Sequence, residues 1–428
     1  MVIKMNKIEI KGLDEYIYHK VLDNGLNIYL YKTNNTNEYK VSFFTKYGST
    51  YNNFKIKGNK EYKNYPIGIA HFLEHKLFES EDKEKPFEFF SKSGTRANAY
   101  TSFFQTCYHI TGINNYEENL NFLIDFVQEP YFTEENVKKE KGIIKQEINM
   151  YNDTPNWVMF FRTLYNLIHK HSIRYDIGGT VESINKITKD MLYECYNTFY
   201  SPNNMTIVVS GNIDVDKTIK LIEQNQKSKE LKNNEYIKEN VKEPKEVYLE
   251  SDEITMNVGI PMISVGVKIP VNSDNKEKND IYINMIIEEN FGKKSEFYID
   301  NLSENVISGD FSISTNQIDK YFLVIFTSKT NNPKELIKRL KEKLNNLNIT
   351  KDFFNREKKN YISDTIYAFE NHSLVNDLIE NHIVLYNKTI ENIYIDLLNL
   401  KYEELNNIFN NLNLKNITSL IISKNTLK

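Results

Sequence analysis

The chain contains stretches in which apolar and polar residues alternate, and this period of two predicts β-strands. Residues 18–31 predict two short strands around the turn signal Asp23-Asn24-Gly25, and residues 96–113 predict one long strand or a pair. Between them, residues 48–66 are rich in Asn, Lys and Tyr and predict a polar loop. Further strands are predicted at residues 40–46 and 205–210.

Apolar residues recur three and four positions apart in other stretches, which predicts amphipathic helices. In residues 115–128 this apolar stripe is Leu120, Leu123, Ile124 and Val127. Thr133 comes directly before two glutamates and is a typical helix start. Including these two, helices are predicted at residues 68–80, 86–93, 115–128, 133–151, 157–169 and 188–199.

The order of elements recurs later in the chain. Residues 321–344 parallel 108–127, and residues 402–423 parallel 191–210. We therefore expect an α+β protein of two homologous domains, each an antiparallel sheet backed by helices. A helix and a polar tract rich in Lys and Glu separate the two copies. We therefore predict a first domain at 1–217, a helix end and linker at 218–245, and a second domain at 246–428.

The strongest candidate for chemistry lies in residues 68–80, which read GIAHFLEHKLFES. On a helix, His71, Glu74 and His75 share one face. Two imidazoles at this spacing can bind one divalent ion, and a neighbouring carboxylate can take a proton from a water that the metal activates. A helical His is more often an ordinary core or surface residue. Residues 281–292, the counterpart in the second copy, contain no His, so we expect metal binding in the first copy alone.

A catalytic zinc usually has three protein ligands, so one more is needed. Glu140 and Glu147, in the segment EKGIIKQE, are the candidates. Seven residues apart on a helix, they share a face but lie about 10 Å apart along its axis. One would bind the ion and the other would orient a ligand or the substrate. The spacing leaves open which is which, and also allows both to be solvated surface charges.

Composition excludes several other classes of protein. Hydrophobic residues at 40% suffice for real cores, and with a net charge of −4 and no basic stripe we expect no nucleic-acid partner. Cys107 and Cys195 form no CxxC pair, which excludes thiolate zinc sites and a disulfide scaffold. The first residues contain no apolar signal segment, and no apolar run is long enough to span a bilayer. We therefore expect a cytoplasmic protein without a transmembrane segment.

Several motifs in order resemble the pitrilysin, insulinase and mitochondrial processing peptidase family of zinc peptidases. They are HFLEH at 71–75, NAYTS at 98–102, EKGIIKQEI at 140–148, Asp153-x-Pro155, and SPNNMTIVVSGNID at 201–214. The resemblance extends over essentially the whole chain and is strongest in residues 66–214.

This resemblance implies one Zn²⁺ per chain, bound by His71, His75 and Glu147. It implies that Glu74 is the general base and that Glu140 is the supporting catalytic carboxylate.

The strand with Asn98, Ala99 and Tyr100 resembles the edge strand to which such enzymes add their peptide by main-chain hydrogen bonds. This mode of binding predicts a preference for extended, unfolded peptides. The alternative is a plain core strand.

The resemblance implies a metalloendopeptidase that hydrolyses short or unfolded peptides, with the two domains forming half of a peptidase chamber. Family assemblies use an Arg and a Tyr from a second domain or subunit, but residues 295–313 contain no Arg and only a misplaced Tyr298. We therefore expect a homologous subunit in a heterodimer, or a homodimer. The alternative is a non-catalytic peptide-binding or scaffolding subunit of a heteromeric peptidase complex. The half-length format resembles bacterial members, including the group associated with elongation factor P modification.

Overall fold

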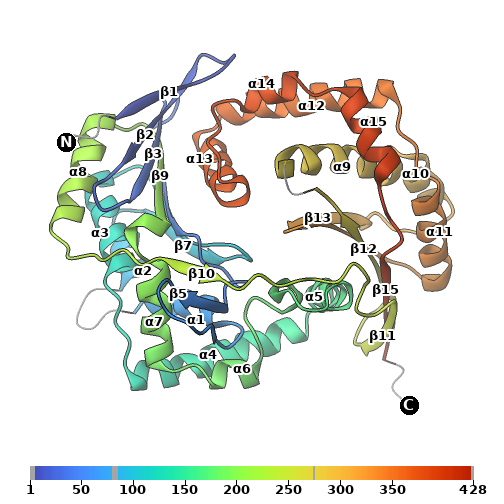
Figure 1. Ribbon diagram of the computed structural model, residues 1–428, viewed down its shortest axis with the longest axis horizontal. Coiled ribbons are helices and arrows are strands. Elements are labelled where there is room, and N and C mark those ends of the chain that lie inside the picture. The colour runs from blue at the N-terminus through green and yellow to red at the C-terminus, as the bar shows by residue number, and fades with distance from the viewer. Residues whose placement is uncertain (1–4, 80–84, 273–274, 426–428) are drawn as a thin grey trace. The chain divides into compact units, whose positions relative to one another are not determined.

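The computed structural model describes residues 5–79, 85–272 and 275–425, and the chain divides into two compact units (Figure 1). Unit 1 comprises residues 1–148, 176–240 and 362–398, and unit 2 comprises 149–175, 241–361 and 399–428. Each unit therefore contains a segment from the other half of the sequence. The predicted boundaries at 217 and 246 follow chain order and stay a prediction. The predicted end of the His-containing helix, residue 80, lies outside the described residues.

Unit 1 contains a 7-stranded sheet with the order β1-β2-β3-β9-β4-β8-β7. The predicted hairpin at 18–31 forms β2 and β3, and residues 96–113 form the pair β7 and β8, so these predictions are confirmed. The strands are β1 (Asn6–Ile10), β2 (Glu15–Val21), β3 (Asn27–Lys32), β4 (Tyr39–Thr45), β7 (Arg96–Thr101), β8 (Thr106–Gly112) and β9 (Met205–Gly211).

Helices cover both faces of this sheet. The helices α3 (Tyr116–Gln128) and α8 (Val215–Lys227) lie on one face and α13 (His372–Asn381) on the other (Figure 1). Every residue of the central strands β4 and β9 is buried, as expected for strands covered on both sides. The other helices of this unit are α1 (Ile69–Leu77), α2 (Pro86–Lys92), α4 (Glu134–Asn152), α6 (Val181–Asn185), α7 (Lys189–Phe199) and α14 (Ile393–Leu398).

The predicted polar loop at 48–66 is wrong in part. It contains β5 (Asn53–Ile56) and β6 (Lys63–Asn64), and β5 pairs with β10 (Tyr236–Lys238) from the predicted linker. These strands are two to four residues long and lie at the surface, so they show no apolar alternation. Phe54 gives β5 its anchor by stacking on Tyr65 at 4.7 Å.

Unit 2 is built on a 5-stranded sheet with the order β11-β15-β12-β14-β13. Its strands are β11 (Ser251–Met256), β12 (Met262–Pro270), β13 (Ser312–Ile318), β14 (Tyr321–Lys329) and β15 (Ile417–Lys424). Its helices are α5 (Pro155–Leu167), α9 (Lys276–Phe291), α10 (Glu296–Ser303), α11 (Pro333–Asn345), α12 (Lys351–Phe369), most of which lies in this unit, and α15 (Tyr402–Asn411).

The two sheets confirm the predicted duplication. The order β3-β9-β4-β8-β7 in unit 1 is repeated as β11-β15-β12-β14-β13 in unit 2. The prediction of antiparallel sheets backed by helices is confirmed except for one parallel pair in each sheet, β3 with β9 and β11 with β15. The last strand of each copy returns through helices rather than a tight hairpin, and such a crossover permits parallel pairing.

The two copies also exchange a helix. The first half of the sequence supplies α5, which packs on β12 and β15 of unit 2. The second half supplies α13, which packs on β4 and β9 of unit 1. Each exchanged helix follows a 19-residue helix, α4 or α12. One face of the unit 1 sheet is therefore covered by a helix from the second half of the sequence.

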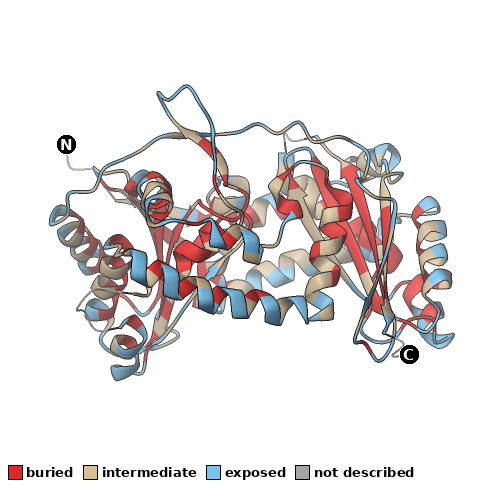
Figure 2. Cartoon of the chain, turned by 90° about the horizontal axis from the view of Figure 1, so that it is seen from below, coloured by how far each residue is buried: buried red, intermediate tan, exposed pale blue. Residues whose placement is uncertain are grey.

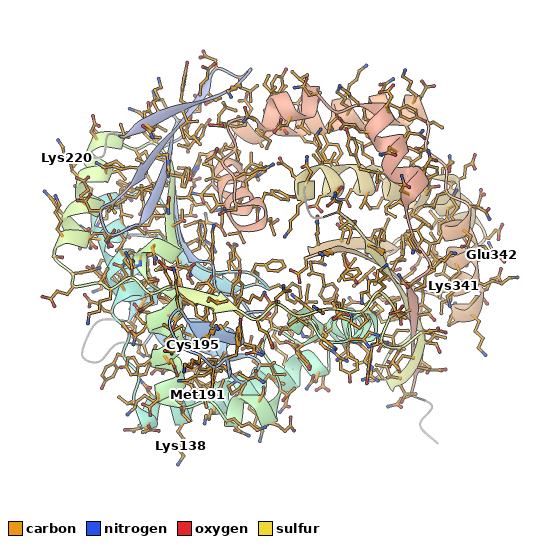
Figure 3. The ribbon with its side chains drawn as sticks, in the orientation of Figure 1. Lys138, Met191, Cys195, Lys220, Lys341 and Glu342 are labelled. Carbon is orange, nitrogen blue, oxygen red and sulfur yellow. The ribbon has the colours of Figure 1, made fainter. Side chains whose placement is uncertain are left out.

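Burial follows the layers of each unit. Figure 2 shows buried strands, and helices with a buried inner and an exposed outer face. Charged side chains such as Lys138, Lys220 and Lys341 extend outward from the helices α4, α8 and α11 (Figure 3). None of the helices in the described ranges is long and apolar enough to cross a membrane.

Candidate metal centre

Helix α1 is fixed at its start by a close backbone contact. Gly68 precedes the helix with φ +89°, a conformation that favours glycine, and a Cβ there would lie 2.4 Å from the carbonyl oxygen of Gly178. Gly179 has φ +78°, and a Cβ on it would lie 2.5 Å from the carbonyl oxygen of Ile67. The loop with the Gly178-Gly179 pair thus packs directly on the first turn of α1. This loop is not predicted from the sequence above, although adjacent glycines before a Thr helix cap are a usable signal.

The apolar face of α1 holds the helix in the core. Phe72, Leu73 and Leu77 are buried in the main cluster of unit 1. His71 and His75 lie on a different face, with their ring centres 4.6 Å apart. Amphipathic anchoring therefore fixes the direction in which both imidazoles point.

His71, His75 and Glu147 converge, and one donor atom from each lies within 4.8 Å of the others. Nε2 of His71 is 3.8 Å from Oε1 of Glu147, and Nε2 of His75 is 3.5 Å from Oε2. Two ligands bound to a tetrahedral zinc at 2.0–2.1 Å are about 3.3 Å apart. The three side chains therefore fit a zinc ion with small adjustments of their rotamers.

Glu140 lies on the other side of His75. Its Oε1 is 3.0 Å from Nδ1 of His75, so a protonated Nδ1 donates to the carboxylate and Nε2 remains directed at Glu147. The second ring nitrogen of a metal-binding imidazole usually donates to a carboxylate, a backbone carbonyl or a water, and here it faces a carboxylate. The geometry distinguishes the two glutamates that spacing alone left open: Glu147 faces both Nε2 atoms, and Glu140 supports His75.

The state of His71 also fits a metal ligand. Burial, reinforced by His75, lowers the pKa of His71 to about 3, so the imidazole is neutral near pH 7. Its Nδ1 is buried and accepts or donates no hydrogen bond within the described part of the chain. A neutral imidazole keeps one lone pair for a cation, and the nitrogen of His71 that faces Glu147 is Nε2 rather than the unbonded Nδ1.

Two carboxylates near the imidazoles, those of Glu74 and Glu147, lie where a negative charge is unfavourable and a cation would stabilise it. Burial raises the pKa of Glu74, although the hydrogen bond from Thr101 and the charge of His75 oppose this. Burial also raises the pKa of Glu147, with added repulsion from Asp176 and Glu140. Buried carboxylates close to one another are stabilised by a divalent cation, so the chemistry of the donor set agrees with the geometry.

Glu74 is held in place by a neighbour that the sequence prediction did not name. The hydroxyl of Thr101, the last residue of β7, donates to Oε2 of Glu74 at 2.6 Å. The side chain of Glu74 is buried, and α1 packs directly against β7. This contact fixes the carboxylate between the helix and the end of the strand.

The predicted peptide-binding residues lie on β7, which is an edge strand of the 7-stranded sheet. Among the strands of the described ranges, β7 pairs only with β8, so its other edge is available for main-chain hydrogen bonds. Asn98 and Tyr100 are exposed, while Ala99 packs towards the core. Addition of a peptide strand requires such an open edge, and peptide binding at β7 stays a prediction.

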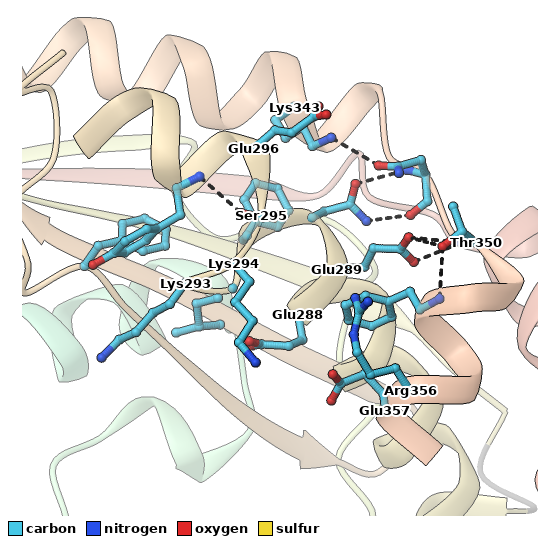
Figure 4. Close-up of a pocket in the computed structure, with 18 of the residues that line it drawn as sticks. Glu288, Glu289, Lys293, Lys294, Ser295, Glu296, Lys343, Thr350, Arg356 and Glu357 are labelled. Carbon is cyan, nitrogen blue, oxygen red and sulfur yellow. Dashed lines mark hydrogen bonds between the residues drawn. The ribbon is translucent and has the colours of Figure 1, made fainter. Parts of the chain in front are cut away.

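Unit 2 contains a cavity of about 790 Å³ at the corresponding place in the repeat, between α9, α12 and β13 (Figure 4). Charged residues line it, among them Glu288, Lys294, Arg356 and Glu357. Burial and the charge of Glu357 raise the pKa of Glu288, and Lys294 opposes this. No histidine is among the residues found to line it.

Comparison with known proteins identifies the family of peptidases to which the fold belongs. Residues 30–181 match the family model described as insulinase (peptidase family M16), and residues 186–361 match the model described as peptidase M16 inactive domain. The zinc protease YmfH of Bacillus subtilis, named as uncharacterized, is 46% identical over 313 residues, which are 71% of this chain and 72% of YmfH. The chain belongs to the M16 (insulinase) peptidase family, as the motifs predicted.

Solved structures agree with this assignment. An M16-like peptidase from Alicyclobacillus acidocaldarius has a TM-score of 0.91 and 28% identity, over 97% of this chain and 100% of that one. The periplasmic protease PqqL of Escherichia coli shares the fold, with a TM-score of 0.71 and 18% identity. The match covers 95% of this chain but 47% of PqqL, so this chain corresponds to about half of that longer protein.

Proposed function

We propose that this protein is a zinc-dependent metalloendopeptidase that hydrolyses short or unfolded peptides. The observation that carries this proposal is the convergence of His71, His75 and Glu147 beside the buried carboxylate of Glu74. Relatives named as zinc proteases support the class of activity.

In this proposal His71, His75 and Glu147 hold one Zn²⁺ per chain. When bound, the ion supplies a Lewis acid that lowers the pKa of water and polarises the scissile carbonyl. Glu74 accepts the proton of the attacking water and delivers it to the leaving amine. Thr101 keeps the Glu74 carboxylate aimed at this position, and Glu140 keeps the His75 ring in its orientation.

The substrate binds as an added strand along β7. Main-chain groups of Asn98, Ala99 and Tyr100 then pair with the peptide backbone, so extended segments are preferred with little regard to their side chains. This part of the proposal is supported by the open edge of β7 and by the contact of its last residue with Glu74.

We further propose that a second subunit completes the site. Residues 295–313 include α10 and the start of β13, and their Tyr298 packs in the core of unit 2 at the lining of its cavity, without an Arg in the same segment. A homologous chain carrying the Arg and Tyr, or a second copy of this chain, would complete it. Residues 1–217 as the zinc-binding domain, 218–245 as the linker, 246–428 as the metal-free domain and a cytoplasmic location belong to the same proposal.

The second candidate is a non-catalytic peptide-binding or scaffolding subunit of a heteromeric peptidase complex. It is favoured by the match of residues 186–361 to a family model described as an inactive domain. Activity alone separates the two candidates, because both bind peptides with the same fold.

The deciding experiment is cleavage of a quenched fluorescent peptide library by the zinc-loaded protein, alone and with its homologous partner. Cleavage that a chelator abolishes and zinc restores is the expected result. Peptide binding without cleavage, in the presence of zinc and of every homologous partner from the same cell, would establish the scaffolding subunit instead.

A further inference from the structure

Two carboxylates hold the β7–β8 hairpin from opposite faces of the sheet. On one face Thr101 donates to Glu74 at 2.6 Å. On the other face the hydroxyl of the preceding residue, Tyr100, donates to Oε1 of Glu380. Successive side chains of a strand point to opposite faces, so adjacent residues of β7 connect Glu74 to a residue 280 positions away from Tyr100.

Glu380 lies near the end of α13 and is 2% exposed. It also accepts from Nε2 of Gln105 at 2.8 Å and from Sγ of Cys107 at 3.6 Å, and the Ser42 side chain of β4 bonds it as well. Tyr100, Gln105 and Cys107 come from β7, from the turn and from β8, so this carboxylate binds every part of the hairpin. Burial raises the pKa of Glu380, and the hydrogen bonds from Tyr100 and Ser42 oppose this. A carboxylate at such depth depends on its donors.

The other polar side chains of α13 make contacts elsewhere on the sheet. Asn376 accepts from Ser42 Oγ at 2.7 Å and donates to the carbonyl oxygen of Val208 at 3.1 Å, which ties α13 to β4 and β9. Asp377 pairs with Lys40 on β4 at 2.5 Å. Asn376 and Asp377 therefore hold α13 on the central strands, and Ser42 of β4 interacts with both Asn376 and Glu380, whereas only Glu380 among these three side chains of α13 bonds the hairpin.

We propose that Glu380 is a positioning residue that fixes the position of β7 through its hydrogen bond with Tyr100. The position of β7 in turn determines where its open edge lies and, through Thr101, how the Glu74 carboxylate is oriented. This inference rests on the proposed function. When the hydrogen bond between Tyr100 and Glu380 is lost, the hairpin shifts relative to α1, and Thr101 no longer holds Glu74 at its present distance. Small misplacements of reacting groups lower kcat/KM by on the order of 10- to 100-fold.

The test uses the zinc-loaded full-length protein in four variants. Tyr100→Phe removes the hydroxyl that donates to Glu380. Glu380→Ala removes the carboxylate that holds the hairpin, and Glu380→Gln keeps a side-chain oxygen that can accept from Tyr100. Asn376→Ala is the matched control, because it removes an equally buried contact of the same helix with the central strands. We expect Tyr100→Phe and Glu380→Ala to lower kcat and raise KM, Glu380→Gln to recover most of the loss, and Asn376→Ala to leave KM unchanged. A fall in kcat with constant KM in all four variants would mean a merely structural role and would overturn the inference.

Hydrogen–deuterium exchange of the zinc-free protein gives a second measurement that needs no activity. We expect amides of residues 96–112 to exchange about tenfold faster in Tyr100→Phe and Glu380→Ala, the order of magnitude expected when a buried hydrogen bond is lost, and to be unchanged in Asn376→Ala. Unchanged exchange in the hairpin would overturn the inference even if the enzyme is active. Conversely, if the wild-type protein cleaves nothing but the variants show the expected differences in exchange, the proposed function is refuted and the role of Glu380 in holding the hairpin is established.

Discussion

Glu140 supports the metal without binding it, and its removal should weaken zinc binding by a predictable amount. Its carboxylate accepts a hydrogen bond from Nδ1 of His75 at 3.0 Å and is almost fully buried, with 4% exposed. In Glu140→Ala the imidazole loses the acceptor that fixes its tautomer and makes Nε2 a better donor to a cation.

The expected magnitude follows from this role. Loss of a carboxylate behind a metal-binding His typically weakens metal affinity 10- to 100-fold, or about 1.4–2.7 kcal/mol. Glu140→Gln keeps a neutral acceptor at the same place, so we expect its zinc affinity to fall by about 10-fold, the lower end of this range. Glu147→Gln removes a direct donor, and we expect its zinc affinity to fall below that of both Glu140 variants.

The assay is competition for zinc between the protein and a fluorescent chelator at pH 7, which gives Kd for each variant. Glu135→Gln is the control, because it is an exposed glutamate of the same helix. An unchanged Kd in Glu140→Ala would refute the supporting role. A larger loss in Glu140→Ala than in Glu147→Gln would show that the two glutamates have been assigned in the wrong order.

The remaining predictions concern the base, the helix start and a buried ion pair. Glu74→Gln should keep zinc, measured by plasma mass spectrometry, and lose on the order of 10²- to 10⁴-fold in kcat; joint loss of zinc would count against the base. Gly68→Ala puts a Cβ 2.4 Å from a backbone oxygen and should lower Tm and zinc occupancy together, and an unchanged Tm would contradict the contact. Glu243 pairs with Lys268 at 2.7 Å, with both side chains buried, and Glu243→Gln should cost about 3–5 kcal/mol in urea unfolding at pH 7. Burial opposes ionisation of Glu243, but Lys268 and three backbone N–H groups outweigh it and lower its pKa, so this stability is present above about pH 4.5 and is lost as the pH falls further. A stability difference that grows on acidification would contradict that sign.

The sequence predicted the elements whose apolar pattern is long and regular. The stripe of Leu120 and Leu123 predicted α3, and the turn at Gly25 predicted the β2–β3 hairpin. The repeat of strand and helix patterns predicted the duplicated sheet. Periodicity reports which face of an element is buried, and these elements are long enough to show it.

Periodicity could not show which sheet each helix covers. Both α5 and α13 are amphipathic, but each packs in the unit built mainly from the other half of the sequence. The strands β5, β6 and β10 are too short to alternate.

Part of the candidate site was likewise predictable from local sequence, and part was not. The spacing on one helix predicted that His71, Glu74 and His75 lie together, and the family resemblance implied Glu147 as the third ligand. Thr101, Asp176 and Glu380 escaped prediction because their contacts join segments far apart in the chain. Such contacts follow from the tertiary fold, which no local pattern encodes.

Zinc K-edge X-ray absorption of the loaded protein, with zinc counted per chain, examines the metal centre itself. We expect one zinc per chain with nitrogen and oxygen neighbours at about 2.0–2.1 Å, two of them imidazoles, and one imidazole fewer in His71→Ala. Zinc absent after loading, sulfur neighbours at about 2.3 Å, or an unchanged imidazole signal in His71→Ala would contradict this expectation.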